Sequence, residues 1–198
     1  HDVEVIEQVN KITDIAQVKI AKDDSGITFL GKEMDKTYID RVKSLSMNNG
    51  YIERHKDLKI VYTPLHGTGI TVVPAALKAY GFENVFVEEH QAIPDGNFPT
   101  CLSPNPENPE ALEAGLRKAK EVDADILLAT DPDADREAIA VKTSSGEWVL
   151  FNGNQTATLF TYYLLERWQQ EHKLTGKQFV IKTIVTSEMV RKVADSFN

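Results

Sequence analysis

Short apolar runs alternate with amphipathic stretches along the central part of the chain. The runs at 58–62, 84–88 and 125–129 have the length and composition of buried strands, whereas residues 70–80 and 109–122 carry apolar positions at helical spacing. Alternating strands and helices predict right-handed crossovers and a sheet with helices on both faces. We therefore expect an α/β protein with three α/β/α layers and a mixed, mostly parallel sheet.

The residues after this central part predict a hairpin and a long helix. Residues 138–142 and 148–151 flank a Ser-Ser-Gly-Glu turn and predict the two strands of the hairpin. Asn152 is the expected N-cap of a helix over 153–169. The aromatic side chains of this helix are expected to form a buried core stripe, made of Phe160, Tyr162, Tyr163 and Trp168.

The two ends of the chain carry weaker patterns. Near the N-terminus, helical spacing covers residues 3–9 and 36–47, and a short strand is expected at 26–31. The sequence Asn-Asn-Gly at 48–50 is expected to end the second helix. Toward the C-terminus, a strand at 177–184 is expected to lead into a helix that has no stop signal, so we expect a piece of a longer protein.

Composition argues against several classes of protein. The chain has 22 Lys+Arg against 30 Asp+Glu residues, a net charge of −8, so we expect no nucleic-acid partner. Its one cysteine, Cys101, cannot form an intrachain disulfide and fits a reducing cytoplasm. No apolar run approaches the roughly 20 residues that span a bilayer, so we expect no membrane partner. The oligomeric state is not indicated by the sequence.

Three aspartates alternate in the segment 130–136, Thr-Asp-Pro-Asp-Ala-Asp-Arg, directly after a predicted strand. The carboxyl end of a strand is where α/β folds place ligands. Alternate residues of an extended loop point the same way, so the carboxylates of Asp131, Asp133 and Asp135 can converge. Oxygen ligands of this kind suit Mg²⁺, and the planar guanidinium of Arg136 suits a phosphoryl group.

Two other interpretations of this segment were open. A solvated acidic turn, shaped by Pro132, is common for three spaced aspartates. An EF-hand loop is excluded, because its sixth position would be Arg136 rather than Gly and its twelfth would be Lys142 rather than Glu. The strands expected on both sides and the arginine at the end favour a metal–phosphate site over the acidic turn.

Several motifs together resemble the α-D-phosphohexomutases, the phosphoglucomutase/phosphomannomutase family. The metal loop of that family has the pattern Asp-Gly-Asp-Gly-Asp-Arg, and Pro132 and Ala134 stand here at the two glycine positions, a spelling similar to the phosphoglucomutase-2-like branch. The other matching stretches are Thr-Pro-Leu-His-Gly-Thr-Gly at 63–69, Phe-Pro-Thr at 98–100, Pro-Asn-Pro-Glu at 104–107, Ser-Gly-Glu-Trp at 145–148 and Asn-Gly-Asn at 152–154.

The resemblance implies a magnesium-dependent intramolecular phosphotransferase. Such an enzyme moves a phosphoryl group between the 1- and 6-positions (or 1- and 5-) of a sugar phosphate, through an enzyme phosphoserine and a bisphosphate intermediate. It implies that Asp131, Asp133 and Asp135 hold Mg²⁺ and that Arg136 lies beside the phosphoserine. Lys182 best matches a family lysine with a general acid–base or electrostatic role, the alternative being a surface lysine at a strand end.

The resemblance also implies a division into domains. Residues 1–50 would connect from a missing first domain, residues 51–151 would form the metal-loop domain, and residues 152–198 would begin a truncated third domain. No serine of the chain has the Ser-His-Asn-Pro type of context of the family's catalytic serine. We therefore expect a glucose, mannose or pentose phosphate to be the substrate of the full-length enzyme, and the isolated chain to be inactive.

Two rival functions stay open at this point. A non-catalytic phosphate- or nucleotide-binding module would bind its ligand at residues 65–70, where Gly-Thr-Gly gives a weak phosphate-loop signal. A protein-interaction domain would use the segment 90–109, which holds five of the eight prolines. His66, in the turn after the first predicted strand, is expected to pack rather than to catalyse.

Overall fold

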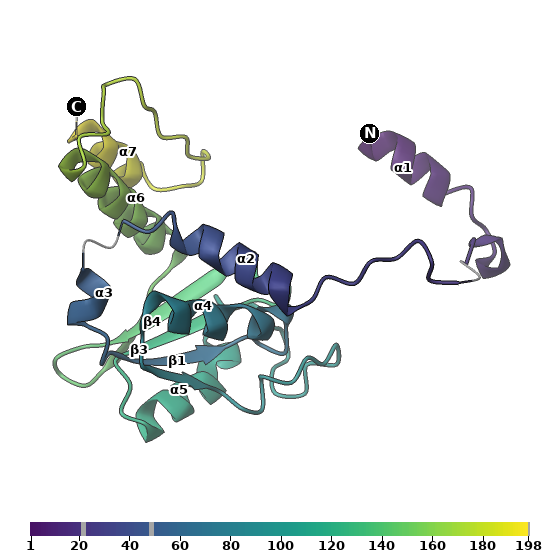
Figure 1. Cartoon of the computed structure of the whole chain (residues 1–198), viewed down its shortest axis with the longest axis horizontal. Coiled ribbons are helices and arrows are strands. Elements are labelled where there is room, and N and C mark those ends of the chain that lie inside the picture. Colours follow the sequence, from purple (N-terminus) through teal and green to yellow (C-terminus); the bar gives the residue numbers. More distant parts are fainter. Residues whose placement is uncertain (21–22, 48–49, 198) are drawn as a thin grey trace. The chain divides into compact units, whose positions relative to one another are not determined.

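A computed structural model describes residues 1–20, 23–47 and 50–197. These residues form two compact units, His1–Met34 and Asp35–Asn198, and the second unit contains the sheet (Figure 1). No helix within the described ranges is both long enough and apolar enough to cross a membrane.

The first unit consists of short helical segments with exposed side chains. Helix α1 (Asp2–Val9) and the 3-10 helix η1 (Ile15–Gln17) bury none of their residues. The strand expected at 26–31 does not form, and residues 25–26 belong to a turn instead. A strand needs a neighbour for its backbone hydrogen bonds, and no described segment pairs with this one.

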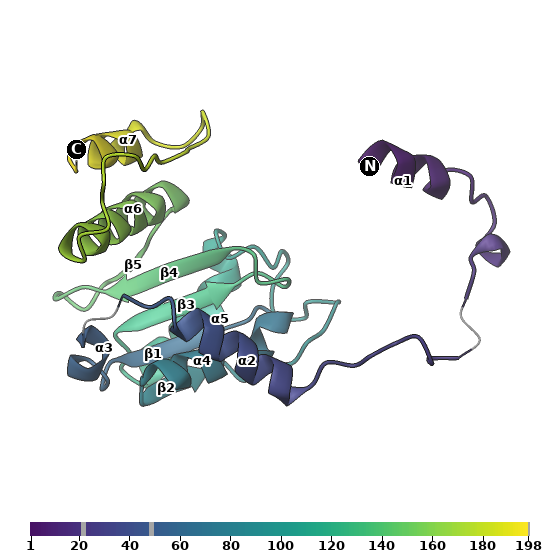
Figure 2. The same cartoon turned by 45° about the horizontal axis from the view of Figure 1, so that its top comes forward.

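The second unit is built on one mixed sheet with the strand order β2-β1-β3-β4-β5. The strands are β1 (Lys59–Thr63), β2 (Asn84–Val87), β3 (Ile126–Thr130), β4 (Glu137–Lys142) and β5 (Trp148–Leu150). Strand β1 pairs in parallel with β2 and β3, whereas β4 is antiparallel to both β3 and β5 (Figure 2). All strands except β4 therefore run in the same direction, which fits the expected mixed α/β fold.

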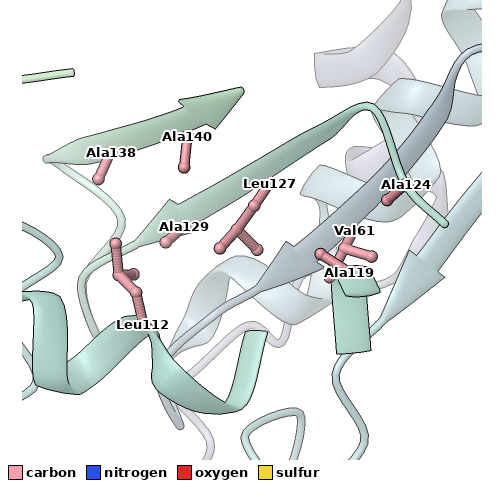
Figure 3. Packing of buried hydrophobic residues seen from close by; sticks show 8 residues of the cluster. All are labelled: Val61, Leu112, Ala119, Ala124, Leu127, Ala129, Ala138 and Ala140. Carbon is pink, nitrogen blue, oxygen red and sulfur yellow. The ribbon is translucent and has the colours of Figure 1, made fainter. Parts of the chain in front are cut away.

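One face of the sheet is covered by α5 (Glu113–Glu121), which follows the 3-10 helix η3 (Pro109–Leu112). Small residues let this helix approach closely, since a Cβ atom on Gly115 would lie 2.9 Å from Leu127 Cδ1. The core on this side is a cluster of alanines and larger apolar residues (Figure 3): Val61, Leu112, Ala119, Ala124, Leu127, Ala129, Ala138 and Ala140.

Helix α4 (Val73–Tyr80) follows β1 after a turn and the 3-10 helix η2 (Thr68–Thr71), and a hydrogen bond joins it to α2 (Lys32–Lys43). Helix α4 ends at Gly81, whose φ of 110° needs a glycine, as predicted. The Tyr80 hydroxyl of α4 donates to the Val42 carbonyl of α2 at 3.2 Å.

The start of α2 lies four residues before the predicted start at residue 36, and α2 ends at Lys43 rather than at residue 47. Asn48 and Asn49, predicted to end it, lie outside the described residues. The short helix α3 (Tyr51–Arg54) follows and leads into β1.

Helix α6 (Gly153–Gln170) begins as the sequence predicted. The Asn152 side chain accepts from the Gln155 N–H at 3.0 Å, and the Gln155 side chain accepts from the Asn152 N–H at 2.9 Å, which completes a capping box. The predicted burial of its aromatic stripe is wrong, because the exposed fractions lie between 37% and 46% for Phe160, Tyr162, Tyr163 and Trp168. The described residues bring α7 (Glu188–Asp195) against α6 but no strand, so most of this stripe is left uncovered.

The strand predicted at 177–184 is also absent from the structure. Its centre is the apolar run Phe179, Val180 and Ile181, and Phe179, Ile181 and Ile184 are more than four-fifths exposed. A short apolar run of this kind is compatible with a strand, but within the described part of the chain no strand lies beside it to supply hydrogen bonds.

Candidate metal site

The three aspartates of the predicted site lie in the loop between β3 and β4. Two backbone hydrogen bonds close this loop on itself, from the Asp131 N–H to the Arg136 carbonyl at 3.3 Å and from the Ala134 N–H to the Asp131 carbonyl at 3.0 Å. Ala134 adopts a left-handed φ of 60°. The carboxylates therefore converge, as predicted, but a tight turn brings them together rather than the alternation of an extended loop.

Asp131 is the organising side chain of the loop and is 1% exposed. Its Oδ1 accepts from the backbone N–H groups of Asp135 at 3.1 Å and Arg136 at 3.0 Å, and its Oδ2 accepts from Arg136 Nε at 2.8 Å. Burial alone would raise the pKa of the Asp131 carboxyl, but these hydrogen bonds outweigh it and hold that pKa below its ordinary value. Asp131 is thus kept ionised inside the protein.

The other two carboxylates are exposed beside it. One oxygen from each of Asp131, Asp133 and Asp135 lies within 4.8 Å of the others. Two bare carboxylates at this separation repel by about 3–4 kcal/mol at an effective dielectric constant of about 20. The interaction with Asp131, together with the charge of Asp133, raises the pKa of the Asp135 carboxyl. A hard divalent cation such as Mg²⁺ fits this all-oxygen donor set and relieves the repulsion.

Arg136 balances only part of the negative charge. Its Nε lies 2.8 Å from Asp131 and 3.8 Å from Asp135, and its side chain is 54% exposed. The hydrogen bond to Asp131 raises the pKa of the guanidinium further. Among the described residues, none forms a hydrogen bond or ion pair with the Nη groups of Arg136. These groups are therefore free to bind an anion beside the three carboxylates.

The turn after β1 lies against this loop but is not itself a phosphate cradle. Four consecutive backbone N–H groups already donate within the protein: that of Leu65 to Thr63 Oγ1, that of His66 to the Gln91 carbonyl, that of Gly67 to the Pro64 carbonyl and that of Thr68 to the Pro132 carbonyl. A phosphate-binding loop needs such groups to point at the ligand. This geometry disfavours phosphate or nucleotide binding by the N–H groups of residues 65–68, which make up most of the segment 65–70 of that rival function.

His66 is part of a buried polar network, as the packing interpretation expected. Its Nδ1 lies 2.9 Å from the Ile93 carbonyl and its Nε2 lies 2.8 Å from Thr100 Oγ1. Thr100 Oγ1 also accepts from Gln91 Nε2 at 3.0 Å, and Thr63 Oγ1 donates to Gln91 Oε1 at 2.6 Å. A carbonyl only accepts, so Nδ1 carries a hydrogen, and in the neutral imidazole Nε2 then accepts from the Thr100 hydroxyl. Both ring nitrogens of His66 are thereby used in holding the turn.

Comparison with known proteins identifies the family. Residues 36–146 match the family described as "Phosphoglucomutase/phosphomannomutase, alpha/beta/alpha domain II". The chain belongs to the phosphoglucomutase/phosphomannomutase family. The match covers more than half of the chain and includes both the turn after β1 and the β3–β4 loop.

Individual members of the family are similar over most of this chain. A phosphomannomutase of Mycoplasmoides pirum is 29% identical over 98% of the chain and 35% of its own length. A phosphoglucomutase of Staphylococcus saprophyticus is 36% identical over 87% of the chain and 30% of its own length. The chain thus spans about a third of the length of these curated relatives.

A solved structure supports the same fold. A phosphoglucomutase/phosphomannomutase family protein from Burkholderia thailandensis has a TM-score of 0.53 at 26% identity, over 68% of this chain and 26% of that protein. The shared architecture is the mixed five-stranded sheet with flanking helices.

Lys182, the other residue singled out from the sequence, lies in a different environment from the aspartates. Its Nζ forms an ion pair with Glu188 Oε1 at 2.7 Å and donates to the Thr186 carbonyl at 3.0 Å. Lys182 and Arg191 together lower the pKa of Glu188 to about 2. The contacts of Lys182 are thus local to the segment that enters α7, whereas the aspartates and Arg136 form one cluster in the β3–β4 loop.

Sequence reasoning missed two neighbours of the aspartates. The Tyr62 hydroxyl and Thr130 Oγ1 form a hydrogen bond of 2.8 Å across β1 and β3, directly before Asp131. A Cβ atom on Gly69 would lie 2.2 Å from that Tyr62 hydroxyl, so this glycine is needed for close packing. Gly69 of the Gly-Thr-Gly motif was the available signal of close packing in the sequence, but a motif does not reveal which atoms come close.

Proposed function

We propose that this chain supplies the magnesium-binding loop of a phosphosugar mutase. The observation that carries the proposal is the convergence of three carboxylates within 4.8 Å, one of them buried and held ionised by Arg136. An acidic turn on a solvated surface has no reason to bury one carboxylate and surround it with three hydrogen-bond donors. Membership of the phosphoglucomutase/phosphomannomutase family supports the same function.

Asp131, Asp133 and Asp135 would hold the ion, one oxygen from each. When bound there, Mg²⁺ would neutralise charge that develops on the oxygens of a phosphoryl group in transfer. Arg136 keeps Asp131 in place through Nε, and the Nη groups of its half-exposed side chain would bind the same phosphoryl group in a bidentate manner. Binding and orienting the phosphoryl group is most of what phosphoryl transfer requires of a protein.

The full-length enzyme would transfer the phosphoryl group between a phosphoserine and a sugar phosphate, through a bisphosphate intermediate, at the 1- and 6- or 1- and 5-positions. We propose that this serine belongs to another part of the enzyme, because no serine of this chain has the expected context. In the full-length enzyme, Lys182 would act as a general acid–base or electrostatic group. The proposed setting is a reducing cytoplasm, with a glucose, mannose or pentose phosphate as the partner molecule.

The domain division follows from the same proposal. Residues 51–151 would be the metal-loop domain, with residues 1–50 leading in from a first domain and residues 152–198 opening a third. The family match to residues 36–146 supports the central part of this division.

A manganese titration tests the metal site. Mn²⁺ takes oxygen ligands as Mg²⁺ does, and free Mn²⁺ can be quantified by electron paramagnetic resonance. We expect the 198-residue chain to bind one Mn²⁺ in the millimolar range or tighter, and Asp133→Asn to weaken the affinity by at least about ten-fold, because a ligand is lost.

Asp57→Asn is the matched control, because Asp57 is exposed and lies outside the loop. It should bind Mn²⁺ as the unmodified chain does. Equal affinity of the unmodified chain and Asp133→Asn, or binding that Mg²⁺ does not displace, would contradict the proposed metal site.

A further inference from the structure

The loop that carries the aspartates forms hydrogen bonds with the turn after β1 through one acceptor atom. Among the described residues, every hydrogen bond from residues 131–136 to other parts of the chain, apart from the pairing of β3 with β4, ends on the carbonyl oxygen of Pro132. Thr68 supplies both of these bonds, through its N–H at 2.8 Å and its Oγ1 at 3.1 Å. Pro132 stands between Asp131 and Asp133, so this contact fixes the backbone between two of the proposed ligands.

Gly67 makes the same contact tighter. A Cβ atom at this position would lie 2.2 Å from Pro132 Cα and 2.4 Å from the Pro132 carbonyl oxygen, which no real side chain tolerates. The φ of Gly67 is −104°, a value that any residue adopts. The glycine is therefore required by the closeness of Pro132 and not by its own backbone conformation.

The turn that holds Pro132 is itself firmly anchored. His66 precedes Gly67, is 4% exposed, and uses both ring nitrogens in hydrogen bonds to Ile93 and Thr100. Its backbone N–H donates to the Gln91 carbonyl at 2.8 Å. A chain of hydrogen bonds thus runs from the 91–100 segment, where Gln91 is buried, through His66 to the turn that contacts Pro132.

Asp133 depends most on this support. Asp131 is fixed by its own hydrogen bonds, whereas no hydrogen bond to the exposed Asp133 carboxylate is seen among the described residues. The direction of Asp133 is thus set by the backbone at Pro132. Residues that orient a ligand through another residue typically change metal affinity by about 10–100-fold when altered.

We propose that Gly67 and Thr68 are positioning residues for the metal loop, and that they act by clamping the Pro132 carbonyl so that Asp133 points at the ion. This inference rests on the proposed metal-binding function of the three aspartates. It assigns to the Gly-Thr-Gly turn a role in orienting metal ligands, in place of phosphate binding, and it makes the buried His66 network the anchor of that turn.

The test compares two glycine-to-alanine variants of the 198-residue chain. Gly67→Ala places a methyl group against Pro132, whereas Gly96→Ala adds the same methyl group in open space, with nothing within 4 Å. We expect Gly67→Ala to weaken Mn²⁺ binding at least ten-fold and to speed hydrogen exchange of the Asp135 and Arg136 amides. Gly96→Ala should match the unmodified chain in both measurements within two-fold.

The exchange measurement separates this inference from the proposed function, because it needs no metal. Faster exchange of those two amides in Gly67→Ala supports the clamp even if the unmodified chain binds no Mn²⁺, a result that would remove only the metal assignment. Unchanged exchange, or unchanged Mn²⁺ affinity in a chain that binds the ion, overturns the clamp.

A second pair of variants decides the matter if Gly67→Ala does not fold. Thr68 is exposed, so its substitution does not disturb the core. Thr68→Val keeps the shape and removes the Oγ1 donor, and Thr68→Ser restores the donor. We expect faster exchange of the Asp135 and Arg136 amides in Thr68→Val and rescue in Thr68→Ser, and equal exchange in the two variants overturns the clamp.

Discussion

The three aspartates of the loop differ at the scale of single residues, although their spacing is regular. Asp131 is buried and accepts three hydrogen bonds, while Asp133 and Asp135 are exposed. Asp131 therefore has a structural role in addition to any role as a ligand. Its substitution should damage the fold of the loop, and substitution of Asp133 should not.

We predict that Asp131→Asn lowers the free energy of unfolding by about 1–3 kcal/mol. An amide in this position must turn its NH₂ group toward either Arg136 Nε or the two backbone N–H groups, so that donors face donors. The melting temperature should fall by about 2–4 °C for each kcal/mol of lost stability in a chain of this size. Asp133→Asn is the control and should leave the melting temperature unchanged; equal melting temperatures of the two variants would remove the structural role of Asp131.

Part of this candidate site could be predicted from the amino-acid sequence alone. The three aspartates and Arg136 could be selected from spacing and chemistry, because a strand end and a run of alternating carboxylates are local signals. The support from Gly67 and Thr68 could not, because Thr68 and Pro132 are 64 positions apart along the chain. Only the pairing of β1 with β3 brings them together.

At the scale of elements, the predictions succeeded for helices, which make their own backbone hydrogen bonds, and for strands that have a neighbouring strand to pair with. The strands β1 to β5 and the helices α4, α5 and α6 were all recognised within a few residues, since hydrophobic period and caps are local. The predictions of strands at 26–31 and 177–184 are wrong, because a strand needs a neighbouring strand that its own sequence does not contain. The predicted burial of the aromatic stripe of α6 is wrong for the same reason. The helical period of apolar residues tells which face is apolar, but it does not tell what covers that face.

The start of α7 offers a test of acid sensitivity. Lys182 and Arg191 lower the pKa of Glu188 from 4.5 to about 2, so ionised Glu188 favours the folded segment. A lowered carboxyl pKa contributes stability that is present above pH 4.5 and is lost as the pH falls toward 2. We expect an NMR titration of Glu188 to give this low pKa, and Lys182→Met to raise it more than Arg191→Met does. An ordinary pKa for Glu188 in the unmodified chain would show that the ion pair does not persist in solution.

At the scale of the whole molecule, the proposed reaction needs a phosphoserine and a sugar-binding site, which we expect in other parts of the full-length enzyme. Asp133, Asp135 and Arg136 are exposed, and the backbone N–H groups of residues 65–68 in the neighbouring turn already donate within the protein. The chain also spans only about a third of the length of its curated relatives. We expect no catalysis from positioned charges alone, because phosphoryl transfer also requires a nucleophile and a bound sugar.

We therefore predict that the purified 198-residue chain binds Mn²⁺ but converts no glucose 1-phosphate to glucose 6-phosphate. A coupled assay with glucose-6-phosphate dehydrogenase measures this conversion. The decisive comparison is between the chain and its Asp133→Asn variant, because turnover by a contaminating mutase would be the same in both preparations. Turnover that rises with the chain concentration and disappears in Asp133→Asn would refute the prediction.

The hydrogen bonds from Thr68 to the Pro132 carbonyl also determine when the aspartate loop can reach its final position during folding. Thr68 follows the first strand of the sheet and Pro132 follows the third, so neither can engage the other until the chain between them has folded back. Helices can form earlier, since their contacts are local. If the aspartates hold the ion as we propose, manganese uptake during refolding would report closure of the central sheet, because the loop takes its place only after residues up to 136 have been made and β1 has paired with β3.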